Sequence, residues 1–329
     1  MSVSRSSRRI ALAVAVVAAG GWLVSGGCAF GDKRASHGKE LYAHYCAHCH
    51  GKNGRQNEGY NWAQMPDPRP KNLSNKDEMS TLKDEEIFQT ISRDMKDTTP
   101  EIGDKIGDDE FAVPTMPTFK YTLSEEEIWD IVAYVRTLHG TKLSIDIEGR
   151  KKKLEANLQE AQQTFDAAEK KASEEADKKG TEVDKSAYAK GQEALVAAKK
   201  DLDKAKTALT SFSARPRFAA IPRPELTLAS NQAAKLAETG KRLFQSKYGC
   251  NACHRIGEAG GVVGPALDRA GFRLNSTWVY RWIKYPQTMK PDTRMPNLGL
   301  SDSDAKAITM YLSTLKAPPP EQPGTQAAR

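Results

Sequence analysis

The sequence predicts a mainly α-helical protein in which an antiparallel coiled-coil hairpin joins two small helical domains. Three observations support this fold class. The motif Cys-x-x-Cys-His occurs at 46–50 and again at 250–254. The residues around both copies keep one order, with Gly-x-x-Leu and an aromatic residue before the motif, and Met-Pro and then Leu-Ser after it. Between the copies, residues 144–215 contain no proline and repeat apolar residues at steps of three and four, the pattern of a coiled coil.

Residues 1–31 are predicted to be an export and anchoring segment. Three arginines precede an uncharged run from Ile10 to Gly27, whose 18 residues would span about 27 Å as a helix, enough to cross a bilayer core. The arginines would stay in the cytoplasm, which places the rest of the chain outside it. Cys28 follows three small residues in a pattern that resembles a bacterial lipoprotein cleavage site, so it is a candidate for lipidation. An uncleaved anchor helix and a plain signal peptide are the alternatives.

The first predicted domain covers residues 32–143. A helix that begins near Gly38 is expected to run up to the first motif. Apolar residues at helical spacing predict a second helix over 81–95. Ser124 is predicted to cap the last helix, with Glu127 completing a capping box. The buried face of that helix is expected to consist of Ile128, Ile131, Val132, Val135 and Leu138.

The hairpin is predicted over residues 144–215, which are rich in Ala, Lys, Glu and Asp. The seam of its first arm is Leu154, Leu158, Ala161, Phe165, Ala168 and Ala172. The seam of its second arm is Tyr188, Gly191, Leu195, Ala198, Leu202, Ala205, Leu209 and Phe212. Lys179-Gly180-Thr181 interrupts the pattern, and two antiparallel arms are favoured because each seam needs a partner. One long helix and a partly disordered charged linker are the alternatives.

The remainder of the chain is predicted to contain a Pro-rich linker over 216–229, a second helical domain over 230–317 and a disordered tail over 318–329. In the second domain, Gly240-x-x-Leu243-Phe244 precedes the motif, and Met295-Pro296 and Leu300-Ser301 follow it. Eleven residues past the leucine of each Leu-Ser pair lies a tyrosine, Tyr134 or Tyr311. The second domain therefore repeats the plan of the first.

Cys-x-x-Cys-His is the attachment pattern of a c-type haem. Two thiols one helical turn apart can each add to a haem vinyl group, and the imidazole that follows can bind iron. A thioredoxin-like redox pair would not need the histidine and expects a βαβ pattern, and a zinc site would need a fourth ligand. The two motifs therefore predict two covalently bound haems, attached through Cys46, Cys49, Cys250 and Cys253 and ligated by His50 and His254.

This plan resembles class I cytochrome c domains, and the resemblance covers both predicted domains. It implies a small helical fold in which the first and last helices cross. Gly38 and Gly240 would be the close-contact residues there, and Tyr134 and Tyr311 the aromatic partners on the last helix. The resemblance also implies that the turn Gly264-Pro265 supplies the carbonyl that orients His254. The first domain has no Gly-Pro, and Pro68 or Pro70 is expected to substitute.

Each iron needs a sixth ligand or an open site. A methionine thioether opposite histidine is the pairing of electron-carrying c-type cytochromes. Met116 and Met295 fit this role because each precedes a proline on a loop just before the last helix of its domain. Met65 and Met289 are the alternatives. His44 and His48 are expected to be surface residues.

The net charge of +7 is unevenly spread along the chain. Residues 32–143 carry 15 Lys and Arg against 20 Asp and Glu, a net charge of −5, whereas residues 216–329 carry 16 against 8, a net charge of +8. No base-stacking or phosphate-binding motif accompanies the net positive charge, so this charge does not indicate nucleic-acid binding. The charge difference bears instead on the docking of redox partner proteins.

The chain resembles the di-haem c-type subunits of respiratory complexes such as quinol–cytochrome c reductases and haem–copper oxidases. This resemblance implies an electron-transfer protein rather than an enzyme, tethered on the periplasmic side of a bacterial membrane. The expected partners are a quinol-oxidising complex, small cytochromes or a terminal oxidase. The alternatives are a di-haem enzyme, such as a peroxidase with one open haem site, and a structural adaptor built on the hairpin.

Overall fold

The computed structural model describes residues 33–59, 69–94, 116–177, 185–217, 224, 226 and 230–318. These ranges are mainly helical and contain no strand, which confirms the predicted fold class. Within them, no helix is both long enough and apolar enough to cross a membrane. The predictions for residues 1–31, including lipidation of Cys28, lie outside the described residues, as do those for Met65, Pro68, most of the linker and residues 319–329.

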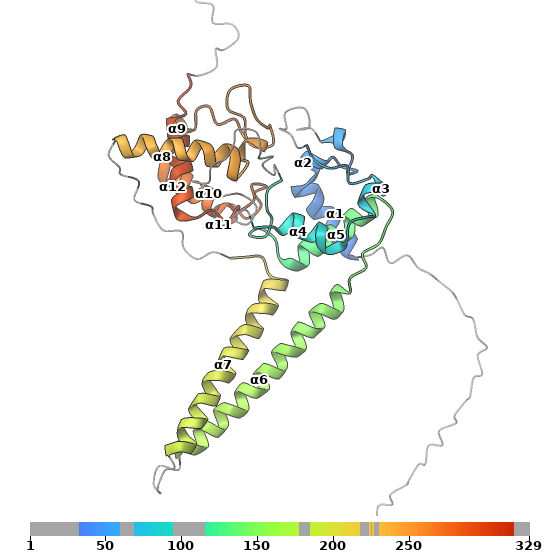
Figure 1. The fold of residues 1–329 in the computed structure, drawn as a ribbon, viewed down its shortest axis with the longest axis vertical. Helices are drawn as coiled ribbons and strands as arrows, with labels where there is room; N and C mark the ends of the chain where they lie inside the picture. The colour runs from blue at the N-terminus through green and yellow to red at the C-terminus, as the bar shows by residue number, and fades with distance from the viewer. Residues whose placement is uncertain are drawn as a thin grey trace, which may run out of the picture. The chain divides into compact units, whose positions relative to one another are not determined.

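The first domain brings its first and last long helices together at a glycine. Its elements are α1 (Lys33–Tyr45), α2 (Ala47–His50), η1 (Gln56–Glu58), α3 (Lys76–Met79), α4 (Asp84–Ser92) and α5 (Glu125–Leu138) (Figure 1). A Cβ at Gly38 of α1 would lie 1.8 Å from the carbonyl oxygen of Asp130 in α5, so only glycine allows this approach. Tyr42 packs on Tyr134, with ring centroids 5.1 Å apart. Both contacts confirm the predicted roles of Gly38 and Tyr134.

The second domain is built on the same plan. Its elements are α8 (Ser230–Arg242), η3 (Leu243–Lys247), η4 (Cys250–Ala252), α9 (Ala270–Arg273), α10 (Ser276–Lys284), α11 (Pro286–Met289) and α12 (Asp302–Thr314) (Figure 1). A Cβ at Gly240 of α8 would lie 1.9 Å from the carbonyl oxygen of Ala307 in α12. Phe244 packs on Tyr311 at a centroid distance of 5.6 Å. The repeat seen in the sequence is therefore a repeat of helix packing.

Serine residues begin the last helix of each domain. The Ser124 hydroxyl accepts a hydrogen bond from the backbone N–H of Glu127, and the Glu127 carboxylate accepts one from the N–H of Ser124, at 3.1 and 2.9 Å. This is the predicted capping box. In the second domain, the hydroxyl of Ser301 accepts a hydrogen bond from the N–H of Asp304 at 3.1 Å. These bonds satisfy amide groups that the first turn of a helix cannot satisfy itself.

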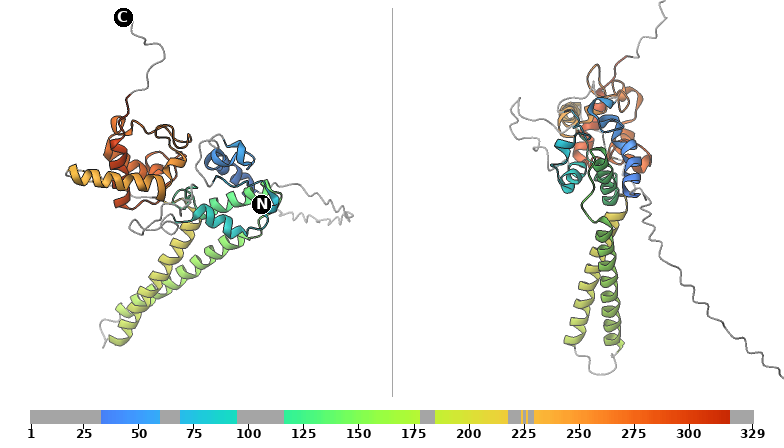
Figure 2. Two further views of the ribbon diagram at one scale, coloured as in Figure 1. Left: turned by 45° about the horizontal axis from the view of Figure 1, so that its top comes forward. Right: turned by 90° about the vertical axis from the view of Figure 1, so that its right-hand side faces the viewer.

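Helices α6 (Ile147–Asp177) and α7 (Lys185–Ser213) form the hairpin. They lie antiparallel and side by side in every view (Figures 1 and 2). The predicted seam residues of both arms are buried or half-buried, apart from Tyr188, which is 39% exposed. Tyr188 lies in the first turn of α7, and the facing end of α6 carries Ala172 and Ala176 but no large apolar side chain to cover it. The predicted interruption at 179–181 lies outside the described residues.

The base of the hairpin is fastened to the first domain. Ile147 and Phe212 are buried and belong to the hydrophobic core of that domain. Three consecutive glutamates in the first turn of α5 form ion pairs with basic residues of the hairpin. The pairs are Arg150–Glu125 at 2.7 Å, Lys151–Glu126 at 3.1 Å and Arg215–Glu127 at 2.8 Å. The two arms therefore leave from and return to the same helix, and the hairpin is continuous with the first domain.

Candidate functional site

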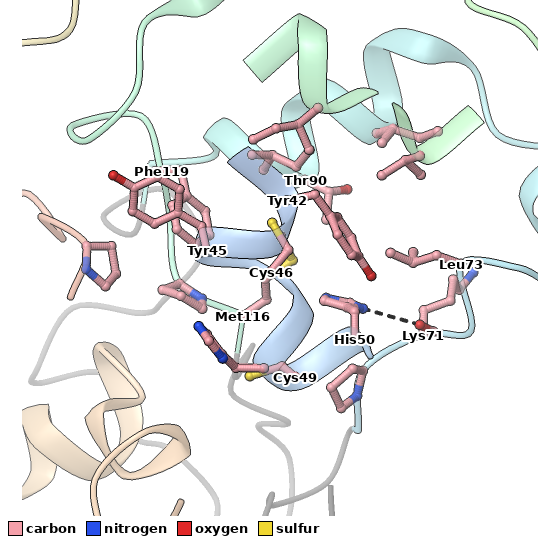
Figure 3. A pocket seen from close by; sticks show the side chains of 18 of the residues that line it. Tyr42, Tyr45, Cys46, Cys49, His50, Lys71, Leu73, Thr90, Met116 and Phe119 are labelled. Atoms are coloured by element: carbon pink, nitrogen blue, oxygen red, sulfur yellow. Dashed lines mark hydrogen bonds between the residues drawn. The ribbon is translucent and has the colours of Figure 1, made fainter. Parts of the chain in front are cut away.

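The first domain encloses a cavity of about 410 Å³ next to the first motif. Cys46, Cys49 and His50 line it from the end of α1 and from α2, and Met116 lines it from a separate loop (Figure 3). Most other lining residues are apolar. The majority come from α1, α3, α4, α5 and the loops next to them, and five come from residues 252–296 of the second domain. A largely apolar cavity of this size, with a few polar groups at defined positions, is typical of a cofactor site.

The imidazole of His50 is held in one orientation. Its Nδ1–H donates a hydrogen bond to the carbonyl oxygen of Lys71 at 3.3 Å (Figure 3). Burial lowers the pKa of His50, and the bond to Lys71 opposes this only in part. The ring is therefore neutral, and its Nε2 keeps the lone pair that a metal ligand needs. The carbonyl comes from the residue after Pro70, so neither Pro68 nor Pro70 itself supplies it.

The second domain encloses a similar cavity of about 460 Å³, lined by Cys250, Cys253, His254 and Met295. The Nδ1–H of His254 donates to the carbonyl oxygen of Pro265 at 2.8 Å, as the resemblance to cytochrome c domains implied. Burial lowers the pKa of His254, so this imidazole is also neutral. A Cβ at Gly264 would lie 2.3 Å from Cε1 of the His254 ring, so the glycine lets the turn come against the imidazole.

Met295 is positioned by a residue that the sequence did not single out for this role. The indole Nε1–H of Trp282 donates to the sulfur of Met295 at 3.0 Å. Trp282 in turn stacks on Trp278, with centroids 5.2 Å apart and ring planes 9° apart. Two tryptophans four residues apart on α10 share one face of the helix, which is the sequence signal for this arrangement. Met289, the alternative ligand, does not line the cavity.

Met116 is held through its backbone. Its carbonyl oxygen accepts a hydrogen bond from Nη2 of Arg93, and Arg93 also lines the cavity. Among the residues that the structure describes, the Nε of Arg93 is buried and has no hydrogen-bond partner, and burial lowers the pKa of this side chain. A buried guanidinium with an unsatisfied N–H favours an anionic partner such as a carboxylate. The cavity therefore offers a site for a ligand that carries carboxylate groups.

Three of the four motif thiols have raised pKa values and are neutral. Burial raises the pKa of Cys46, Cys250 and Cys253 to about 12. His48, expected at the surface, is buried, because it lines the first cavity and hydrogen-bonds to the carbonyl of His44 at 3.0 Å. Each cavity thus brings together the two thiols and the imidazole of its own motif, the thioether of a methionine that precedes proline, and a largely apolar wall. This donor set fits a covalently attached haem, whose iron supplies one-electron chemistry.

The fold and these donor sets define a helical protein built to hold haem covalently. The family model described as Cytochrome c matches residues 35–139 and 237–316, more than half of the chain, and the chain therefore belongs to the cytochrome c family. Membership implies covalently bound haem c and suggests electron transfer. The comparisons found no similar curated protein and no similar solved structure. The two matched segments coincide with the two domains that carry the motifs.

Proposed function

We propose that this chain is a tethered di-haem c-type cytochrome that carries single electrons between components of a respiratory chain. One observation carries the proposal: two separate domains each enclose a cavity lined by a Cys-x-x-Cys-His motif and by a methionine that precedes proline. In each cavity a carbonyl fixes the tautomer of the proximal histidine. Haem attaches through Cys46 and Cys49 in the first domain and through Cys250 and Cys253 in the second.

Electron transfer, rather than a reaction at the iron, is favoured by the two methionines. His50 with Met116, and His254 with Met295, would each ligate one haem iron, and this pairing of residues is typical of electron-carrying cytochromes. An enzyme such as a di-haem peroxidase would need one iron with an exchangeable position and an acid–base group above it. The acidic loop over 100–111, which could supply such a group, lies outside the described residues.

The proposed location is the periplasmic side of a bacterial membrane, with the N-terminal segment as the tether. Its support is the arginine-flanked apolar run and the small residues before Cys28. The proposed partners are a quinol-oxidising complex, small cytochromes or a terminal oxidase. The opposite net charges of the two domains would direct different partners to each of them.

The intact mass of the protein isolated from a host with working c-type cytochrome maturation tests this proposal. We expect the polypeptide plus two haems, and a mature N-terminus that begins at a lipid-modified Cys28. The ferric spectrum should contain the Met–iron charge-transfer band and no high-spin component. A mass with one haem or none overturns the di-haem assignment, and a stable high-spin haem favours the peroxidase alternative.

A further inference from the structure

The two cavities share a wall. Five residues line both of them, which are Pro117 of the first domain and Cys253, Val263, Arg294 and Pro296 of the second. The prolines that follow the two candidate ligands Met116 and Met295 are both part of this wall. A loop of the second domain, drawn in faint orange, borders the first cavity (Figure 3). The two sites are therefore neighbours within one structure.

Contacts between the two Met-Pro loops hold this wall together. The backbone N–H of Asn297 donates to the hydroxyl of Thr122 at 2.9 Å, and these residues are 1% and 2% exposed. A Cβ at Gly299 would lie 2.2 Å from the ring of Tyr121, so glycine is needed for the loops to come this close. A buried hydrogen bond and a backbone-to-ring contact give the loops a defined relative position.

Arg294 is the charged residue among the five that line both cavities. Other charged residues line one cavity each: Arg69, Lys71 and Arg93 line the first, and Lys290 and Asp292 line the second. Arg294 thus borders the cavity of the first domain as well as that of its own domain. Its position next to Met295 in the sequence would suggest an effect on the second site alone.

We propose that Arg294 is shared by the two haem sites. Its fixed positive charge raises the reduction potentials of both haems together. The inference rests on the proposed di-haem function. A nearby cation favours the reduced iron centre, which carries one positive charge less than the oxidised centre. Arg294 is solvent-exposed, so dissolved salt screens its charge and its effect on both potentials diminishes as ionic strength rises.

Redox titration of Arg294→Gln at low ionic strength tests the proposal. We expect both midpoint potentials to fall, and the fall to shrink when salt is added. Arg294→Lys keeps the charge and should restore both potentials. Lys290→Gln removes the same charge from a residue that lines the second cavity alone, so it should lower one potential only. Arg242→Gln, exposed on α8 and lining neither cavity, should leave both unchanged.

The Met–iron band and the haem content of each variant are measured alongside the potentials. If Arg294→Gln keeps both haems and both bands but moves one potential or neither, the shared role of Arg294 is wrong. If Arg294→Gln loses the Met–iron band of the second haem, the test uses Arg294→Lys and the wild type instead. Midpoint potentials that do not change with ionic strength in either of these two proteins would also overturn the proposal. A wild-type mass with a single haem would instead refute the proposed function.

Discussion

At the scale of single residues, the two candidate haem sites depend on partners that orient the expected ligands. Lys71 and Pro265 accept hydrogen bonds from the two proximal histidines, and Trp282 donates to the sulfur of Met295. Such outer partners fix the tautomer and direction of a ligand and tune the metal that it binds. The motif thus identifies the ligands, while residues distant in the chain determine how these ligands are presented.

Replacing Met295 tests its assignment as a ligand. In Met295→Ala we expect one of the two Met–iron bands to disappear and the potential of that haem to fall, because a methionine ligand raises it. The haem should stay attached, since Cys250 and Cys253 form the covalent bonds. Met289→Ala is the matched control, because Met289 does not line the cavity. Loss of the band in Met289→Ala, with its retention in Met295→Ala, would exchange the two assignments.

At the scale of secondary-structure elements, one buried ion pair joins three segments of the first domain. Asp84 at the start of α4 accepts a hydrogen bond from Arg136 of α5 at 2.5 Å, and from the backbone N–H of Ser144, just before α6, at 2.7 Å. The side chains of Asp84 and Arg136 are 1% and 6% exposed. Arg136 also donates to the carbonyls of Met79 and Leu82. This cluster fixes the position of α4, which carries part of the cavity wall.

The stability of the first domain should therefore depend on pH through Asp84. Burial alone would raise the pKa of Asp84, but hydrogen bonds from Ser144 and Arg136 outweigh it and leave the pKa below its ordinary value of 3.8. A carboxyl group whose pKa is lower in the folded state than in the unfolded state stabilises the fold at pH values above the unfolded-state pKa. This contribution disappears as the pH falls through the folded-state pKa.

We expect Asp84→Asn to cost about 3 to 5 kcal/mol at pH 7, because it leaves the buried Arg136 without its counter-charge. The difference from wild type should narrow below about pH 4 as the wild-type carboxylate is protonated. Denaturant unfolding at a series of pH values measures both effects. Glu85→Gln, in the same first turn but exposed, should be nearly neutral. A difference that stays constant down to pH 2 would contradict the assignment to Asp84.

At the scale of the whole molecule, the hairpin is an insertion between two copies of one domain. Its base is tied to α5 by the three glutamate ion pairs and by Ile147 and Phe212 in the core. Beyond this base, α6 and α7 continue side by side to their distal ends (Figures 1 and 2). We expect the distal half to be available to contact another protein, because the residues tied to the first domain lie at the base.

Shortening the hairpin tests that role. A variant that joins Ala161 to Ala198 through a short flexible turn keeps Ile147, Phe212 and the ion pairs at the base. We expect it to retain two haems and an unchanged spectrum. In detergent-solubilised native membranes, we expect its haem absorbance to elute from size exclusion at a smaller size than that of the wild type, because the segment expected to contact a partner complex is missing. Normal assembly combined with slower transfer between the haems would mean instead that the hairpin is a scaffold for the two haem domains.

The features that the sequence alone determined are local or periodic. The Cys-x-x-Cys-His motif, the capping box at Ser124 and Glu127 and the two seams of the hairpin all depend on residues within a turn or a few turns of one another. The crossings at Gly38 and Gly240 could be predicted because both domains repeat the same order of residues. These signals were sufficient for the helical class, the family and the residues expected to bind haem.

Only the tertiary structure decided which distant groups meet. It placed the Lys71 carbonyl on His50, Trp282 on Met295, the three glutamates of α5 on the hairpin base and Arg294 in the wall between the cavities. It also buried His48, which was expected at the surface. These pairings join residues from different elements, and no periodic pattern records them, because they depend on how the packed helices and loops come together in space.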